Sequence, residues 1–192
     1  MCIRDSRYAV LVFRDQPLDD AQQVAFSRHF GPLEMATGDI AQGGQRRLSM
    51  EINDISNLDR DGAVLGRDDR RRLFSLGNML WHSDSSFKPT PAKYSLLSAR
   101  VIPGSGGNTE FADMRAAWDA LDAETQALAR DLVVEHSQLF SRGSLGFDAF
   151  TEEERAKWQP VPQRLVRRHP RTGRLSLFLS AVSYTHLTLP TT

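Results

Sequence analysis

Two side chains that can bind a metal ion lie two positions apart in the segment 78–87 (NMLWHSDSSF): His82 and Asp84. We expect residues 80–87 to form a strand, on which side chains two positions apart point to the same face. An imidazole nitrogen and a carboxylate oxygen would then lie close enough to share one ion. With a second histidine from elsewhere, they would make the two-histidine, one-carboxylate set that suits Fe(II). His-x-Asp alone is a weak pattern, because a hydrogen-bonded pair at a strand edge has the same spacing.

A glycine-rich turn lies downstream of this segment, in residues 103–114 (PGSGGNTEFADM), and leads into a predicted short strand and a helix cap. Its pattern Pro-x-x-Gly-Gly-(Asp/Asn)-Thr, which follows Trp-His-x-Asp-x-x-Phe, resembles the family of taurine dioxygenase and 2,4-dichlorophenoxyacetate dioxygenase. Further likeness lies in residues 12–16 (VFRDQ), 26–33 (FSRHFGPL) and 169–174 (HPRTGR). The resemblance covers most of residues 8–181.

The resemblance implies an enzyme that depends on Fe(II), 2-oxoglutarate and O2. By the same resemblance, His82 and Asp84 match the first two iron ligands. Thr109 matches a threonine whose hydroxyl holds a carboxylate oxygen of 2-oxoglutarate, a task that suits a neutral donor. Asn78 matches a position near the substrate and the metal. Two structural alternatives stay open: Thr109 as the first residue of a strand, and Asn78 as a turn residue.

The family's third iron ligand is a histidine well over a hundred residues beyond the His-x-Asp segment, and an arginine that pairs with 2-oxoglutarate follows it. Only 108 residues follow Asp84. None of the later histidines matches: His136 falls in a predicted helical insertion, His169 in a predicted turn and His186 in the tail. We therefore assign neither the third histidine nor the arginine to this chain. We expect it to be the N-terminal part of an enzyme, with weak iron affinity and little turnover.

Both ends of the chain differ from the rest in composition. Residues 1–6 (MCIRDS) are polar and stop abruptly before the apolar run 8–13, and residues 182–192 (VSYTHLTLPTT) contain no charged side chain of the Asp, Glu, Lys or Arg type. We expect both ends to be non-native, with a genuine terminal strand as the alternative for the tail. Residues 7–181 are then one partial dioxygenase domain.

The elements that must position these residues are mixed. Continuous apolar or alternating runs predict strands, whereas Asp and Thr caps predict helices that begin after residues 19, 113, 122 and 151. Glycine- and charge-rich stretches at 36–47 and 57–74 predict surface loops. Besides 80–87, strands are expected at 8–13, 94–102, 164–168 and 175–181, the last two joined by a turn.

This order indicates an antiparallel β scaffold with helical insertions, a mainly β or α+β fold. The resemblance implies a double-stranded β-helix, the jelly roll of cupin-like proteins, incomplete at its C-terminus. A jelly roll needs all its strands to close its edges. We therefore expect marginal stability and aggregation.

Composition excludes several classes of protein. Lys plus Arg and Asp plus Glu number 24 each, so no net charge favours nucleic acid or an anionic membrane. The single cysteine, Cys2, excludes an internal disulfide and a cysteine-built zinc site. No apolar run approaches the length of a membrane helix and no secretory signal is visible, so we expect a cytoplasmic protein.

The functional hypothesis is an Fe(II)- and 2-oxoglutarate-dependent dioxygenase that hydroxylates a small anionic substrate, of the sulfonate or aryloxyacid type, and releases succinate and CO2. Lys93, Arg100 and Arg142 are candidate cations for that substrate. The partner is then a small molecule, and the full-length protein could be a homo-oligomer. The alternatives are an inactive fragment, a non-catalytic jelly-roll binding module, and a zinc hydrolase that uses His82 and Asp84.

Overall fold

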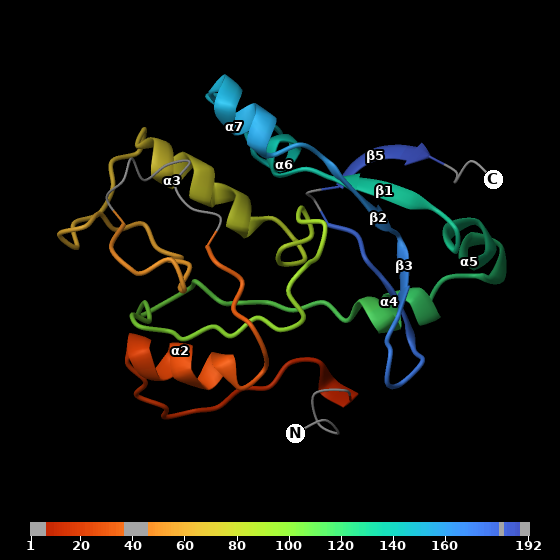
Figure 1. Cartoon of the computed structure of the whole chain (residues 1–192), viewed down its shortest axis with the longest axis horizontal. Coiled ribbons are helices and arrows are strands. Elements are labelled where there is room, and N and C mark those ends of the chain that lie inside the picture. The colour runs from red at the N-terminus through yellow and green to blue at the C-terminus, as the bar shows by residue number, and fades with distance from the viewer. Residues whose placement is uncertain (1–6, 37–45, 181–182, 189–192) are drawn as a thin grey trace.

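The computed structural model describes residues 7–36, 46–180 and 183–188, the last of these for the backbone alone. The first six residues, predicted to be non-native, lie outside this part of the chain. Of the predicted non-native tail 182–192, only the backbone of 183–188 is described, as strand β5 (Figure 1). The domain boundaries proposed above, 7–181, stay a prediction.

The first long helix, α2 (Asp20–Arg28), forms where its cap predicts it. The Asp19 carboxylate accepts a hydrogen bond from the Gln22 backbone N–H at 2.8 Å, and the Gln22 side chain accepts one from the Asp19 N–H at 2.9 Å. This reciprocal capping box satisfies two backbone donors that the helix itself cannot. Gly31, at φ +131°, takes the chain away from the helix.

Helix α3 (Arg70–Ser75) begins within the stretch 57–74, which was predicted to be a loop, and the 3-10 turn η1 (Leu76–Met79) follows it. The prediction was wrong for its last residues. Asp69 caps α3 through the Arg71 backbone N–H at 2.8 Å. Phe74 also packs against aromatic rings from residues more than 70 positions later, which no local pattern reveals.

The main sheet has three antiparallel strands in the order β2-β1-β5. Strand β1 (Val133–His136) lies in the centre, between β2 (Val161–Arg164) and β5 (Ser183–Thr188). In the β1–β2 register, Val134 is paired with Gln163. Both side chains are buried, so this face of the sheet is covered.

A second sheet is the hairpin of β3 (Val166–Arg168) and β4 (Leu175–Leu177), joined through residues 169–173. Gly173 adopts φ +70°, a conformation that favours glycine in a tight turn. The predicted hairpin is confirmed, with shorter strands. His136, by contrast, was predicted to lie in a helical insertion and instead ends strand β1, fully buried.

Four short helices surround the sheets, and each begins at a side-chain cap. The caps include the predicted ones and a further serine at the start of α6. In each cap, a side-chain oxygen accepts a hydrogen bond from a backbone N–H that has no partner within the helix, which typically contributes about 1 kcal/mol to stability. The helices and their caps are α4 (Met114–Asp119, Asp113), α5 (Ala123–Ala129, Asp122), α6 (Gln138–Gly143, Ser137) and α7 (Glu152–Lys157, Thr151).

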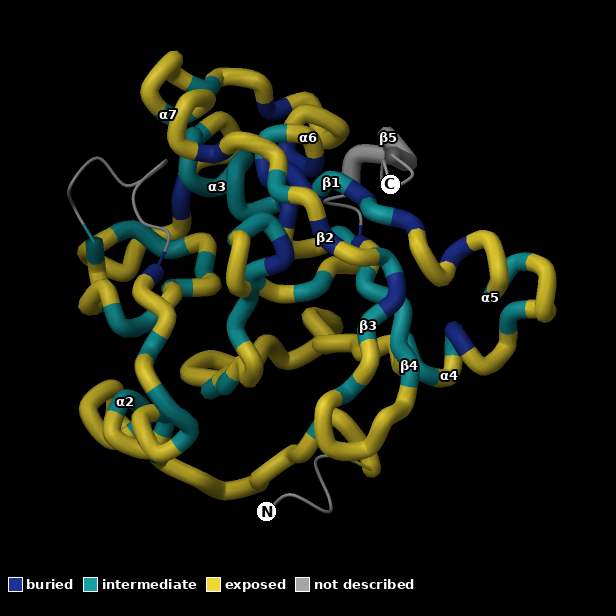
Figure 2. The backbone as a smooth tube through the Cα atoms, turned by 45° about the vertical axis from the view of Figure 1, so that its right-hand side comes forward, coloured by how far each residue is buried: buried dark blue, intermediate teal, exposed yellow. Residues whose placement is uncertain are grey.

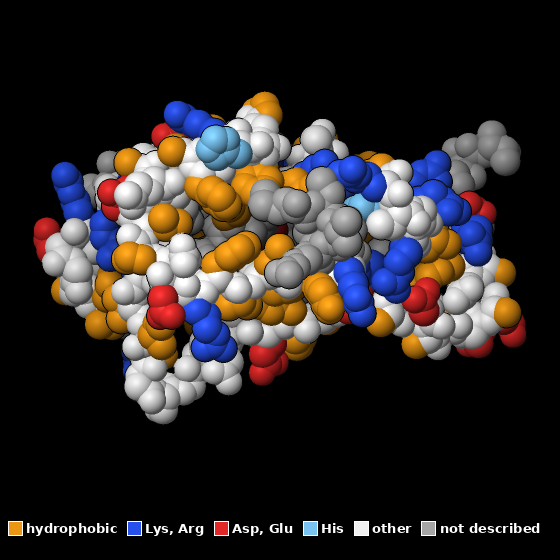
Figure 3. Space-filling view, turned by 90° about the horizontal axis from the view of Figure 1, so that it is seen from below, with side chains coloured by type: hydrophobic (Ala, Val, Ile, Leu, Met, Phe, Trp, Pro, Cys, Tyr) orange, Lys and Arg blue, Asp and Glu red, His pale blue; other side chains and the backbone are white. Residues whose placement is uncertain are grey.

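Three predicted strands, at 8–13, 80–87 and 94–102, are irregular in the structure, so these predictions were wrong. A strand needs hydrogen bonds to a neighbour, and none of the described strands runs beside these segments. Their apolar side chains are consequently exposed, Val101 at 81% and Ile102 at 79%. Figure 3 shows apolar side chains spread over the face seen from below.

Two small clusters contribute to the core of the described part, in which the buried stretches of backbone are dark blue in Figure 2. One joins α4, α5 and the hairpin, and the other joins α3 to α7 through aromatic rings. The first consists of Trp118, Ala129 and Val166, and the second of Phe74, Phe147, Phe150 and Trp158. The described residues form two small sheets and no closed barrel, so the jelly roll stays a prediction. Among them, no helix is both long and apolar enough to cross a membrane.

Candidate metal-binding site

The backbone that leads to the His-x-Asp segment is held by a buried arginine. Arg142, on α6, is 6% exposed, and its guanidinium lies over the Phe74 ring at 4.7 Å. It donates to the Asn78 side-chain oxygen at 3.2 Å and to the Ser141 hydroxyl at 2.9 Å. Gly77 lets it approach, because a Cβ there would lie 2.3 Å from the Arg142 Cζ. The turn η1 is therefore locked against α6 four residues before the candidate ligands.

His82 and Asp84 lie side by side, as predicted, although the segment is not a strand. His82 Nε2 is 3.2 Å from Asp84 Oδ1. Residues 81–83 are irregular, and a turn follows at residues 84–87. On the other side of the ring, Nδ1 lies 2.6 Å from the Leu80 carbonyl oxygen. A carbonyl can only accept, so Nδ1 carries the hydrogen of that bond.

The charges of the pair reinforce each other. The pKa of His82 is raised, first by its hydrogen bond to Asp84 and then by the Leu80 carbonyl, against an opposing effect of burial. The pKa of Asp84 is lowered, first by its hydrogen bond to His82 and further by one to the Ser95 side chain. The nearby Arg142 cation lowers the pKa of His82 slightly. Each residue of the pair thus favours the charged form of the other.

The donor set and spacing of this pair fit a divalent metal ion. Two adjacent ligands of an octahedral ion, each about 2.1 Å from it, lie about 3.0 Å apart. The 3.2 Å between Nε2 and Oδ1 matches this span. The Leu80 carbonyl fixes the ring so that Nε2 is the nitrogen left for the ion, a typical arrangement of metal-bound histidines. Across the described residues, no third His, Cys, Asp or Glu joins the pair to form a metal-binding group.

Thr109 lies in the irregular, exposed stretch that follows Gly106 and Gly107, which adopt φ +70° and +69°. The glycine-rich turn predicted from the sequence is thus present. The described contacts include no hydrogen bond between Thr109 and either residue of the pair. The assignment of Thr109 to 2-oxoglutarate stays a prediction.

The candidate cations for a substrate differ in their surroundings. Arg100 pairs with Asp20 at 2.8 Å, on α2, so its charge is largely compensated there. Lys93 lies over the Tyr94 ring at 5.3 Å. Arg142 is the buried one, and burial lowers its pKa to about 10. Its contact with Asn78 connects it to the site, a link that sequence spacing does not reveal because 64 positions separate the two residues.

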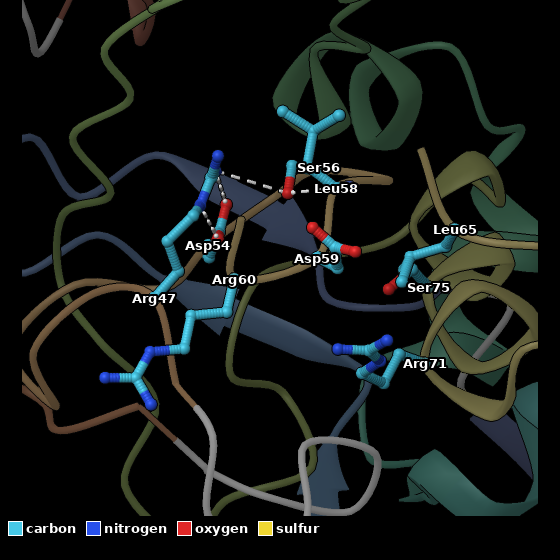
Figure 4. Close-up of a pocket in the computed structure, with 9 residues that line it drawn as sticks. All are labelled: Arg47, Asp54, Ser56, Leu58, Asp59, Arg60, Leu65, Arg71 and Ser75. Atoms are coloured by element: carbon cyan, nitrogen blue, oxygen red, sulfur yellow. Dashed lines mark hydrogen bonds and ion pairs between the residues drawn. The ribbon is translucent and has the colours of Figure 1, made fainter. Parts of the chain in front are cut away.

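A separate polar cavity lies between the loop 47–65 and α3 (Figure 4). Arg47 and Asp54 form a two-pronged ion pair on one wall, at 2.9 and 2.8 Å. The cavity has a volume of about 30 Å³, room for a single water molecule. Neither His82 nor Asp84 lines it, so it is not the candidate metal site.

The family of the chain follows from comparison with known proteins. The model of the taurine catabolism dioxygenase TauD, TfdA family matches residues 3–191, so the chain belongs to this family and the predicted resemblance is confirmed. The family is enzymatic, and several of the curated relatives are named as alpha-ketoglutarate-dependent dioxygenases.

Particular relatives are more informative than the family. The chain is 49% identical over 173 residues to the alpha-ketoglutarate-dependent 2,4-dichlorophenoxyacetate dioxygenase of Cupriavidus pinatubonensis. This alignment covers 90% of this chain and 60% of the relative. It is 41% identical over 180 residues to the (S)-phenoxypropionate/alpha-ketoglutarate-dioxygenase of Sphingobium herbicidovorans, covering 90% and 58%. A crystal structure of AAD-2 in complex with Mn(II) and N-oxalylglycine matches with a TM-score of 0.91 and 55% identity, over 97% of this chain and 65% of that one. The chain spans about 60% of the length of the curated relatives.

Proposed function

We propose that this protein is an Fe(II)- and 2-oxoglutarate-dependent dioxygenase that hydroxylates a small aryloxy acid, with release of succinate and CO2. The observation that carries the proposal is the convergence of His82 Nε2 and Asp84 Oδ1 at 3.2 Å. It occurs in a chain 49% identical to a 2,4-dichlorophenoxyacetate dioxygenase and structurally similar to a protein solved with Mn(II) and N-oxalylglycine.

In this proposal His82 and Asp84 hold the iron. When bound, the metal supplies the redox chemistry with O2, for which 2-oxoglutarate is the co-substrate. The Leu80 carbonyl keeps the His82 ring oriented, and the Ser95 side chain steadies the Asp84 carboxylate. In this proposal the Thr109 hydroxyl donates a hydrogen bond to a carboxylate oxygen of 2-oxoglutarate. The hydroxyl is neutral, so the negative charge of that carboxylate is balanced by a separate cation.

Asn78 is the proposed contact for the substrate. Its side-chain oxygen accepts from Arg142, which fixes the orientation of the amide and directs the nitrogen away from that arginine. An amide nitrogen donates to the carboxylate of an aryloxy acid without adding a second charge. The relatives that are 41–49% identical to this chain are named for aryloxy acid substrates, whereas a relative named for sulfate esters is 30% identical. This difference in identity favours an aryloxy acid as the substrate.

The test is an anaerobic titration of the protein with Fe(II) and 2-oxoglutarate, followed by visible absorption. We expect a charge-transfer band that requires both additions and disappears in His82→Ala and Asp84→Ala, weak in this chain because no third iron ligand is assigned to it. His169→Ala is the matched control, because His169 lies half-buried in the connection between β3 and β4, outside the candidate pair. A wild-type protein without the band, or a band unchanged in His82→Ala, contradicts the proposal.

A second measurement addresses the substrate. Succinate formed from 2-oxoglutarate in the presence of O2 is compared with 2,4-dichlorophenoxyacetate, an alkyl sulfate and taurine as substrates. We expect stimulation by the aryloxy acid above the other two. Aryloxy-acid binding that persists unchanged without metal and in both alanine variants indicates a non-catalytic binding module instead.

A further inference from the structure

The turn that carries Asp84 has little support of its own. Its internal hydrogen bonds run from the Ser86 N–H to the Ser83 carbonyl at 3.4 Å and from the Lys88 N–H to the Ser85 carbonyl at 2.9 Å. Ser85 adopts φ +57°, a conformation that non-glycine residues seldom occupy. No described strand pairs with this segment. Other parts of the protein must therefore hold the turn, and with it the carboxylate.

Gln163 makes the contact that reaches the turn from the interior. Its side-chain nitrogen donates to the Ser86 carbonyl at 2.9 Å and to the Lys88 carbonyl at 2.8 Å. The side chain is 5% exposed, and Ser86 is fully buried. Gln163 comes from β2, paired with Val134 of the central strand β1. The turn is thereby attached to the main sheet.

The orientation of the Gln163 amide is itself determined. Its oxygen accepts a hydrogen bond from Arg167, on β3. Because a guanidinium can only donate, the oxygen must face Arg167 and the nitrogen must face the turn. The Arg167 guanidinium in turn lies 3.5 Å from the centre of the Phe178 ring, which stacks on His136. A partly buried series of contacts thus connects the sheet to the turn that carries Asp84.

The outer side of the same turn is held by Glu34. Its carboxylate accepts from the Ser85 hydroxyl at 2.8 Å and from the Lys88 ammonium at 2.6 Å. These side chains are partly exposed, and exposed ion pairs typically contribute little to stability. The buried contact with Gln163 is therefore the stronger of the two restraints.

We propose that Gln163 is a positioning residue that fixes the turn 83–88 and so sets the geometry of the Asp84 carboxylate for metal binding. This inference rests on the proposed function, in which His82 and Asp84 hold the ion. In Gln163→Leu, the buried Ser86 carbonyl and the partly buried Lys88 carbonyl lose their donor, and the turn relaxes toward water. Partners that orient metal ligands typically change metal affinity 10–100-fold when removed. We expect the dissociation constant for Mn(II) to rise about tenfold.

The test measures Mn(II) binding by electron paramagnetic resonance in the folded proteins. Gln126→Leu is the matched control, because Gln126 also donates to two backbone carbonyls, those of Trp118 and Leu121, at 3.0 and 3.2 Å. Both variants lose the same kind of hydrogen bonds, but only one touches the turn. We expect the Mn(II) dissociation constant to change less than about twofold in Gln126→Leu, against about tenfold in Gln163→Leu.

A second variant covers the case in which Gln163→Leu does not fold. Gln163→Glu keeps the shape and the acceptor for Arg167, but places an oxygen against the Ser86 and Lys88 carbonyls, so it too should weaken Mn(II) binding. Equal Mn(II) affinity in wild type and the folded Gln163 variant overturns the inference, provided that His82→Ala abolishes binding. If His82→Ala binds Mn(II) as wild type does, the proposed function fails instead.

Discussion

Gly77→Ala tests the packing of Arg142 against η1, the turn that precedes His82 and Asp84. The added Cβ would lie 2.3 Å from Arg142 Cζ and 2.4 Å from Nε, against about 3.5–4.0 Å for an ordinary contact. The guanidinium must move by more than about 1 Å and abandon Asn78. Overpacking of this kind costs about 1–3 kcal/mol. The lost hydrogen bond between Arg142 and Asn78 involves a charged group and costs about 1.5–3 kcal/mol. The higher helix propensity of alanine offsets up to about 1 kcal/mol of this cost. We expect a net destabilisation of about 1.5–6 kcal/mol.

The assay is urea unfolding followed by circular dichroism, in which this loss lowers the midpoint by about 1–3 M at a slope of about 2 kcal/mol per M. Gly66→Ala is the control, because a Cβ at Gly66 meets nothing within 4 Å. Arg142→Leu provides a double-mutant cycle: in that background the Gly77→Ala change should cost little, because the clashing group is gone. Equal midpoints for Gly77→Ala and Gly66→Ala would refute the reasoning, and so would costs that simply add in the double variant.

Two further predictions concern the core. Phe147→Ala should lower the free energy of unfolding by about 3–5 kcal/mol, because its buried ring packs edge-on against Phe74 and Phe150; urea unfolding checks this, and a loss below about 1 kcal/mol contradicts it. Burial lowers the pKa of His136 to about 4, whereas a histidine in the unfolded chain has a pKa of about 6.5. As the pH falls, the unfolded state therefore binds a proton before the folded state does. The free energy of unfolding should consequently decrease between about pH 6.5 and pH 4. His136→Gln should remove up to about 3 kcal/mol of this pH dependence, measured as the difference between the two unfolding profiles, and identical profiles would contradict the assignment.

Features that depend on neighbouring residues could be predicted from the sequence. The caps at Asp19 and Thr151 follow from side chains three positions apart, and the hairpin at 169–173 follows from its turn residues. The proximity of His82 and Asp84 was also predicted, and the two side chains lie 3.2 Å apart. The prediction assumed a strand over 80–87, whereas residues 81–83 are irregular and a turn occupies residues 84–87.

Features that depend on distant residues could not be predicted. The strands expected at 80–87 and 94–102 would need neighbouring strands, and propensity alone does not provide the hydrogen bonds. The two side chains that hold the site, Arg142 and Gln163, contact residues 64 and 77 positions away. Nothing in their local sequence distinguishes them from other polar residues. Their roles are visible only once the chain has folded.

The central claim is that His82 and Asp84 together bind a divalent metal ion, and its most direct test is paramagnetic broadening of amide NMR signals during a titration with Mn(II). The account predicts that signals of residues 82–88 broaden first, and that this selectivity is lost in Asp84→Ala. If Thr109 lies beside the ion, as proposed, its amide signal broadens in the same range of Mn(II) concentration. Broadening centred instead on the acidic residues Asp54 and Asp59, which line the cavity in Figure 4, would contradict the claim.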